Sequence, residues 1–243
     1  MSNDNKYYDV HAHFLPSMDL GCKNINDAMQ MVSMMEKQSC QGVIATPHFY
    51  PTETVDVYLK RREDNYAKLK EALLDSELAD FDKKIILGTE VAYHHSLVFE
   101  RNLADLCLGD SNYLLLELPF SKWSNEVLED IEQIIRYRGL RIIIAHLERF
   151  YEYGNKKLIE KLLDMDVAIQ MNTAHLLKFG AFRHALKMIK DQRVDVLCTD
   201  CHGTFFYPPN MEQAMEKMKK NGLEEDMTRM LQNSFAIYKT AES

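Results

Sequence analysis

The stretch that decides the fold is residues 7–13, Tyr-Tyr-Asp-Val-His-Ala-His, near the start of the 243-residue chain. A short strand is predicted over residues 8–10, and a His-x-His pair comes directly after it. Because side chains two residues apart in an extended segment point to the same side, His11 and His13 can reach one metal ion. A His-x-His pair alone is a weak signal, so its meaning depends on the residues at the ends of the other strands.

Six further runs of apolar and β-branched residues predict strands, and amphipathic segments that predict helices separate them. Strict alternation of this kind is typical of parallel strands joined by right-handed crossovers, in either a barrel or an open doubly wound sheet. The six strands are expected at residues 42–46, 84–88, 113–116, 141–145, 167–171 and 194–198. Helices are expected near 28–35, capped by Asn24 or Asn26, and at 58–74, 97–106, 125–137, 156–164, 181–191, 211–219 and 224–231.

Histidine and carboxylate residues follow six of these seven strands, and five of the nine histidines lie there. A barrel gathers its active site from the carboxyl ends of many strands, whereas an open sheet uses one switch point. Imidazole and carboxylate together suit zinc, manganese and iron, and this set exceeds the needs of one tetrahedral ion. We therefore expect a multinuclear metal site. The residues concerned are His11, His13, His48, Glu90, Glu117, His146, Asp200 and His202.

Composition predicts an ordinary globular protein. The chain is 46% hydrophobic and 27% charged, and no linker divides it, so residues 1–243 are expected to form a single domain. Its formal net charge of −8 argues against nucleic-acid binding. No apolar run approaches the length of a membrane span, and the N-terminus lacks the apolar core of a signal peptide. With five scattered cysteines as well, a cytoplasmic protein without disulfides is expected.

In combination, these motifs resemble the PHP (polymerase and histidinol phosphatase) family of metal-dependent phosphoesterases. The closer resemblance, over nearly the whole chain, is to the manganese-dependent tyrosine phosphatases of the CpsB/YwqE type, which are encoded with capsular and exopolysaccharide genes. The motifs that carry it are 9–13, 15–16 with Gly21, 45–49, 88–90, 116–117, 145–150, 170–172 and 199–202. The resemblance implies a distorted seven-stranded (β/α) barrel, an α/β fold that holds two or three divalent ions, with manganese favoured over iron or zinc.

The resemblance also implies roles for single residues. It places His11, His13, Glu90 and Asp200 around one ion, and Glu90, Glu117 and His146 around a second. His48 and His202 would hold a third, with Asp19 as the acidic ligand, and Arg149 would grip the phosphate. A metal-activated hydroxide would attack phosphorus, and Asp200 or His202 would protonate the leaving oxygen. The implied substrate is a phosphotyrosine protein, such as a polysaccharide-assembly kinase, and a homo-oligomer is left open.

Two departures from the family pattern stand out. The family usually reads Asp-Asp-Gly after its first strand and uses the second aspartate as a ligand of the third ion, whereas Leu20 stands at that position here. Relatives often carry a phosphate-binding arginine after the last strand, but residues 202–209 contain no arginine or lysine. Both departures leave open a small-molecule phosphatase of the histidinol-phosphate type, or a barrel that binds a phosphoprotein with little turnover.

Other mechanisms and residue roles compete with this interpretation. A cysteine-dependent tyrosine phosphatase needs an arginine six positions after its nucleophile, and none of the five cysteines has one. Amidohydrolases also begin with His-x-His, but the Asp-x-His pattern after the last strand favours the PHP interpretation. His175 is a candidate for the pocket wall. An aromatic rim for a phosphotyrosine ring is the alternative to simple packing for Trp123, Phe205, Phe206 and Tyr207.

Overall fold

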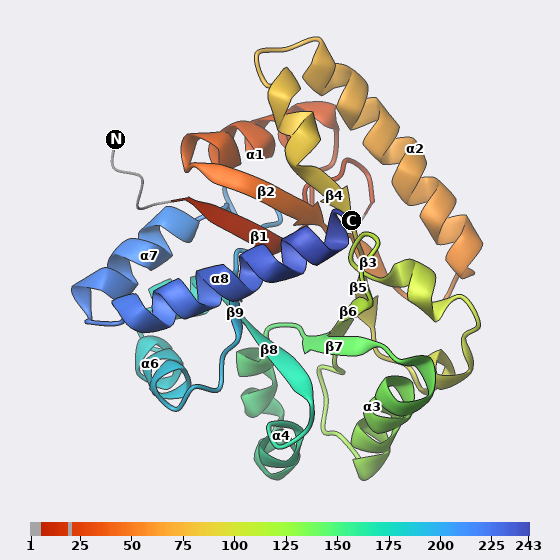
Figure 1. Cartoon of the computed structure of the whole chain (residues 1–243), viewed down its shortest axis with the longest axis vertical. Helices are drawn as coiled ribbons and strands as arrows, with labels where there is room; N and C mark the ends of the chain where they lie inside the picture. Colours follow the sequence, from red (N-terminus) through yellow and green to blue (C-terminus); the bar gives the residue numbers. More distant parts are fainter. Residues whose placement is uncertain (1–5, 19–20) are drawn as a thin grey trace.

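The computed structural model describes residues 6–18 and 21–243, in which helices surround a set of short parallel strands (Figure 1). Each of the seven predicted strands overlaps an observed one. These are β1 (Tyr7–Ala12), β2 (Cys40–Ala45), β4 (Ile85–Leu87), β6 (Tyr113–Glu117), β7 (Arg141–Ile144), β8 (Val167–Asn172) and β9 (Val196–Cys198). Two further short strands, β3 (His48–Phe49) and β5 (Glu90–Ala92), continue β2 and β4 after a break.

The strands form two sheets, which differs from the predicted closed barrel. One sheet has the order β1-β2-β4 and the other has the order β3-β5-β6-β7-β8-β9, and every pair in them is parallel. Between β2 and β3 lies Pro47, which has no N–H for a strand ladder, so the register is interrupted there. In the described part of the chain, β1 meets the segment after β9 through a single bridge, Ala12 with Cys201, so the ring is not closed.

The α-helices follow the predicted order. They are α1 (Ile25–Lys37), α2 (Val55–Leu74), α3 (Asn125–Arg138), α4 (Lys156–Leu162), α5 (Thr173–Leu177), α6 (Phe182–Lys190), α7 (Met211–Lys220) and α8 (Glu224–Ala241). Asn24 caps α1 by accepting a hydrogen bond from Asp27 N–H at 3.0 Å, which confirms one of the two predicted caps. The short helix α5 was not predicted, and α8 extends ten residues beyond the expected end.

Within the described residues, four segments are 3₁₀ helices: η2 (Ala79–Lys84), η3 (His95–Phe99), η4 (Leu103–Leu106) and η5 (Leu147–Tyr153). Residues 97–106 were expected to form one α-helix, but the structure divides them between η3 and η4. Both pieces use the tighter 3₁₀ geometry that is common in short connectors. None of the helices in the described residues is long and apolar enough to cross a membrane.

Helix α8 closes the amino ends of the strands and leaves their carboxyl ends for the site. It runs across the strands and packs on β1, β2 and β9 (Figure 1). Tyr238 donates a hydrogen bond to the carbonyl of Lys84, the residue just before β4. A Cβ at Gly42 would lie only 2.4 Å from Tyr238 Cζ, so this close approach requires glycine. Because all strands run in parallel, their carboxyl ends meet at the opposite edge.

Candidate metal centre

The predicted ligands meet at the carboxyl ends of the strands. His11 lies in β1 and His13 directly follows this strand, and His48 and Glu90 begin β3 and β5 in register with each other. The breaks after β2 and β4 therefore set these two side chains opposite each other across a strand pair. The remaining ligands are Glu117 at the end of β6, His146 directly after β7, and Asp200 and His202 after β9. Asp19 and Leu20 lie outside the described residues.

Four of these side chains form the tightest group. Nε2 of His11 lies 3.0 Å from Nε2 of His13, 3.2 Å from Oε2 of Glu90 and 3.4 Å from Oδ1 of Asp200. Nε2 of His13 is 3.1 Å from the same Glu90 oxygen. All four side chains are buried, with His11 and Glu90 fully so. Donor atoms that crowd this closely repel one another through their lone pairs, so the arrangement suits a cation at their centre.

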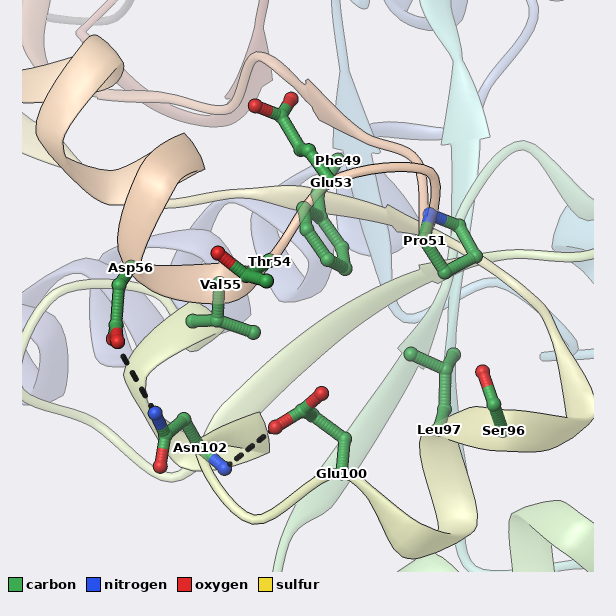
Figure 2. Close-up of a pocket in the computed structure, with 10 residues that line it drawn as sticks. All are labelled: Phe49, Pro51, Glu53, Thr54, Val55, Asp56, Ser96, Leu97, Glu100 and Asn102. Carbon is green, nitrogen blue, oxygen red and sulfur yellow. Dashed lines mark hydrogen bonds between the residues drawn. The ribbon is translucent and has the colours of Figure 1, made fainter.

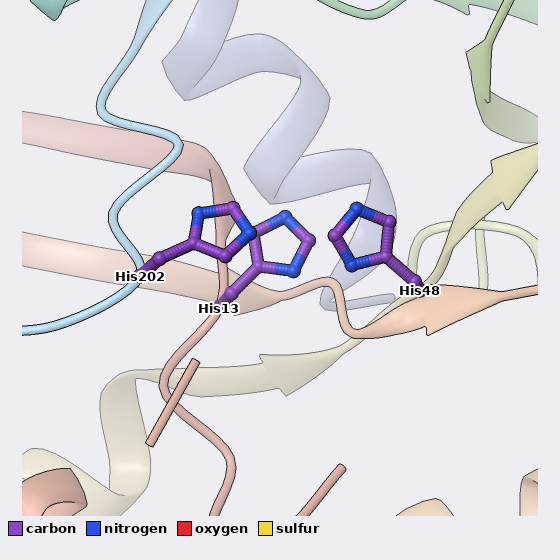
Figure 3. A group of neighbouring side chains, drawn as sticks. All are labelled: His13, His48 and His202. Atoms are coloured by element: carbon purple, nitrogen blue, oxygen red, sulfur yellow. The ribbon is translucent and has the colours of Figure 1, made fainter. Parts of the chain in front are cut away.

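Two more groups share members with the first. Nε2 of His146 lies 2.9 Å from Oε1 of Glu90 and 3.3 Å from Oε1 of Glu117. Figure 3 shows the rings of His13, His48 and His202 side by side, and one ligand atom of each lies within 4.8 Å of the others. Glu90 thus faces ligands of every group: its Oε2 is also 3.0 Å from Nε2 of His48.

Two buried carboxylate oxygens test whether these residues fit metal ions. Oε2 of Glu90 and Oδ1 of Asp200 are buried and have no hydrogen-bond partner. A buried, unpartnered carboxylate oxygen is costly unless a cation lies beside it. Both atoms face histidine Nε2 atoms, which are themselves metal-binding atoms when they carry no proton. The donor set of imidazoles and carboxylates therefore fits divalent ions such as manganese, iron or zinc.

Electrostatic interactions in the group favour ionised carboxylates. Burial alone raises the pKa of Glu90, but attraction to His11 and His48 outweighs it and holds the pKa well below the usual range. Burial also raises the pKa of Asp200, but attraction to His11 and His146 outweighs it and lowers the pKa. Burial lowers the pKa of His146, whereas hydrogen bonds to Glu117 and Glu90 raise it to about 10. Without a metal ion, His146 therefore carries the compensating positive charge.

A cavity of about 820 Å³ opens over these groups. Its wall includes Arg149, whose guanidinium carbon lies 4.8 Å from the Phe120 ring centroid and whose Nη1 is 3.8 Å from Oδ2 of Asp200. The Arg149 side chain is 46% exposed, so it can reach a ligand in the cavity. His175 also lines this cavity.

The aromatic residues divide between the rim and the core. Phe205, Phe206 and Tyr207 line the cavity and are 83%, 76% and 62% exposed. Trp123 is buried instead and packs on Phe150, with its indole N–H donating to the carbonyl of Pro119. The packing explanation therefore holds for Trp123. Residues 205–207, by contrast, are exposed at the cavity.

Sequence reasoning missed several residues of this cavity. Phe120, Tyr50 and Glu148 line it, and although Glu148 lies in the motif 145–150, none of the three was assigned a role. Gln170 and Asn172, on β8, contact the ligands directly from a strand with no predicted ligand of its own. The available signals were the motif 170–172 and polar residues at the end of an apolar strand, the same signal that identified Glu117.

A smaller cavity of about 350 Å³ lies between the start of α2 and the segment of η3 and η4 (Figure 2). Its acidic residues are Glu53, Asp56 and Glu100. The side-chain amide of Asn102 donates to Asp56, and its backbone N–H donates to Glu100. Since none of the predicted ligands lines this cavity, it is not a candidate for the metal centre.

With this geometry in place, comparisons with known proteins identify the family. Residues 7–238 match the family described as capsular polysaccharide synthesis, CpsB/CapC. The chain belongs to the CpsB/CapC family. Tyrosine-protein phosphatase CpsB of Streptococcus pneumoniae is 25% identical over 224 residues, which cover 87% of this chain and 89% of the relative. Tyrosine-protein phosphatase YwqE of Bacillus subtilis (strain 168) is 26% identical over 226 residues, covering 87% and 84%.

Solved structures share the fold of this chain. Crystal structures of YwqE from Bacillus subtilis and CpsB from Streptococcus pneumoniae, described as metal-dependent tyrosine phosphatases, include a chain that matches with a TM-score of 0.81 at 21% identity. That match covers 96% of this chain and 94% of the other. A mutant organophosphorus hydrolase from Deinococcus radiodurans matches at a TM-score of 0.52 and 10% identity, over 97% and 93% of the two chains. The predicted resemblance to this phosphatase family is confirmed.

Proposed function

We propose that this CpsB/CapC chain is a metal-dependent phosphatase that hydrolyses phosphotyrosine on a protein. One observation carries the proposal: eight histidine and carboxylate side chains converge, and five of them line a cavity whose wall also holds an arginine. The family and the names of its relatives support the same activity. A tyrosine kinase of polysaccharide assembly is the partner that best suits the capsular context of the family.

We assign the ligands in three overlapping sets. The first is His11, His13, Glu90 and Asp200, and the second is Glu90, Glu117 and His146, with Glu90 shared. Divalent ions bound there would neutralise the phosphoryl charge and lower the pKa of a water molecule at the site. We favour manganese, because mixed imidazole and carboxylate ligands suit it, with iron or zinc as alternatives.

The third set is His48 and His202, with His13 close enough to take part. We assign Asp19 as its acidic ligand on the family pattern alone. Leu20 stands where the family has its aspartate ligand. If Asp19 does not take over that role, the chain works with two ions. The count of two or three ions therefore depends on this loop.

The remaining cavity residues bind the substrate. We assign the phosphate to Arg149, because its planar guanidinium can donate two parallel hydrogen bonds to phosphoryl oxygens. Packing on Phe120 holds that guanidinium over the cavity. Phe205, Phe206 and Tyr207 would contact the aromatic ring or its flanking residues, and either Asp200 or His202 would protonate the tyrosine oxygen as it leaves.

A substrate panel tests this function against its nearest rival. The rival, a small-molecule phosphatase of the histidinol-phosphate type, is favoured by the lack of a cationic side chain in residues 202–209. The manganese-loaded protein should hydrolyse phosphotyrosine peptides and aryl phosphates faster than alkyl phosphates. Preference for alkyl phosphates would favour the rival, and metal binding without any turnover would favour a phosphoprotein-binding barrel.

Two substitutions test the ligand assignment within the same assay. His146→Ala and Glu117→Ala should abolish turnover, because each removes a ligand of the second set. His94→Ala is a matched control, since His94 bonds to the neighbouring Ser96 at an exposed position. Near-normal turnover of either ligand variant with metal bound would contradict the assignment.

The wider organisation of the chain is also part of the proposal. We infer that residues 1–243 form one domain, because the single set of strands carries every element of the site. We place the protein in a reducing compartment, since its five cysteines are buried free thiols.

A further inference from the structure

Strand β8 supplies none of the proposed ligands, although it lies between β7 and β9, which each lead into ligands. Its carboxyl end carries two buried amide side chains, Gln170 and Asn172. Both point to the same face of the sheet because they are two residues apart. Their hydrogen bonds connect three ligands that come from three different strands.

One backbone N–H fixes the orientation of the first amide. The N–H of His146 donates to the Gln170 side chain over 2.6 Å, so the atom that accepts must be the oxygen Oε1. Nδ1 of His11 lies 3.1 Å from the same oxygen. Because an amide oxygen only accepts, Nδ1 of His11 must carry its proton. When the imidazole is neutral, Nε2 of His11 then has the free lone pair that a metal ligand needs.

The second amide continues the chain of donors. With its oxygen used, Gln170 presents Nε2, which donates to Oδ1 of Asn172 over 2.7 Å. The Asn172 amide nitrogen then donates to Oδ2 of Asp200 over 2.6 Å. This bond favours the ionised carboxylate. Oδ1 of Asp200 has no hydrogen-bond partner and lies 3.4 Å from Nε2 of both His11 and His13. A buried carboxylate, Glu148, accepts the backbone N–H of Asn172 and completes the series.

The ligands at both ends of this series have unusual backbone conformations. His146 has φ 33° and Asp200 has φ 49°, in the left-handed region that non-glycine residues seldom adopt. Such conformations persist only where neighbouring groups hold them. Gln170 bonds to the backbone N–H of His146, and Asn172 bonds to the side chain of Asp200, so β8 restrains both.

From these contacts, we propose that Gln170 and Asn172 are positioning residues that set the tautomer of His11 and the orientation of His146 and Asp200 for metal binding. The inference rests on the proposed metal centre but not on any substrate. Partners of this kind typically change metal affinity by about 10- to 100-fold when they are removed. The key group is the Gln170 oxygen, because one atom serves two ligands.

The test compares three substitutions at Gln170 with a control. Gln170→Met fills similar space but accepts no hydrogen bond, Gln170→Ala removes both functions, and Gln170→Glu keeps an accepting oxygen. The matched control is Asn233→Ala, which removes an amide hydrogen bond to the carbonyl of Asp195 at the amino end of β9. Metal binding is measured by calorimetry on chelator-treated, folded protein titrated with Mn²⁺.

We expect Gln170→Met and Gln170→Ala to bind Mn²⁺ about 10- to 100-fold more weakly, and Gln170→Glu to bind more tightly than Gln170→Met. Asn233→Ala should match the wild type. Binding by Gln170→Met equal to that of the wild type would overturn the proposal, because space filling alone would then explain the residue.

A spectroscopic readout needs neither metal nor substrate. In the metal-free wild type, ¹⁵N chemical shifts should show the Nδ1–H tautomer of His11, and Gln170→Met should shift it toward Nε2–H. A His11 tautomer that is unchanged in Gln170→Met would contradict the proposal. If the wild type shows the expected tautomer but hydrolyses no phosphate ester, the proposed function fails while this inference stands.

Discussion

The proton on His146 gives a quantitative prediction. Hydrogen bonds to Glu117 and Glu90 raise the pKa of His146 to about 10 against the effect of burial, and only the neutral imidazole can bind a metal ion. At pH 7 the pKa lies about three units above the pH, so removing the proton costs about 4 kcal/mol at 1.36 kcal/mol per unit. Because this one proton must leave, His146 alone should make the apparent metal affinity rise about tenfold per pH unit between pH 7 and pH 9.

Calorimetry in buffers of different ionisation enthalpy measures the protons that metal binding releases. At pH 8, the wild type should release about one proton more than His146→Gln, a variant that keeps an amide in place but cannot titrate. NMR titration of the metal-free wild type should show His146 charged up to about pH 10. Equal proton release by both proteins, or a His146 that titrates near the ordinary histidine value, would refute the reasoning.

The same shift makes metal-free stability depend on pH. The pKa of His146 is higher in the folded protein than in the unfolded chain. The stability that His146 contributes to the folded protein is therefore fully present below about pH 6.5 and is lost as the pH rises through about 10. A shift of this size corresponds to about 5 kcal/mol. The free energy of unfolding of the chelator-treated wild type, measured with urea, should therefore fall across this pH range. The corresponding fall in His146→Gln should be smaller.

Three further substitutions test other parts of the structure. Arg149→Ala should lower kcat/KM for aryl phosphates by roughly thirtyfold, the equivalent of losing about 2 kcal/mol of charge-assisted hydrogen bonding, and steady-state kinetics with unchanged metal content would separate this from a metal effect. Leu20→Asp should raise metal content toward three ions per chain by elemental analysis; no change would mean that Asp19 already serves or that two ions suffice. Gly42→Ala should reduce the free energy of unfolding by about 1–3 kcal/mol, because its Cβ would meet Tyr238. Gly180→Ala, with open space around the new Cβ, is its control.

The main features of the fold were predictable from short-range patterns. Apolar runs indicated every strand except the short β3 and β5, and Asn24 marked the start of α1. The division into two sheets was not predictable in the same way. Pro47 gave a visible reason for the break after β2, but the break between Leu87 and Glu90 depends on how two neighbouring strands pair.

The ligands were predictable because their chemistry is distinctive. Histidines and carboxylates at the ends of apolar strands are costly without partners, so their positions carried information. Gln170 and Asn172 also end an apolar strand, but their signal is weaker, since a neutral amide is ordinary in many polar settings. Their roles arise from contacts with His11 and Asp200, which lie 159 and 28 residues away in the sequence. The left-handed backbone of His146 likewise depends on tertiary contacts that no local pattern encodes.

The most direct test of the proposed metal-dependent phosphatase is metal content measured together with turnover. The protein is purified without chelator or added metal, analysed for its elements, and then assayed on a phosphotyrosine peptide with manganese supplied. We predict two or three divalent ions per chain and peptide hydrolysis that a chelator abolishes. A protein that binds no metal ion, or that hydrolyses the peptide equally well after the ions are removed, would contradict this prediction.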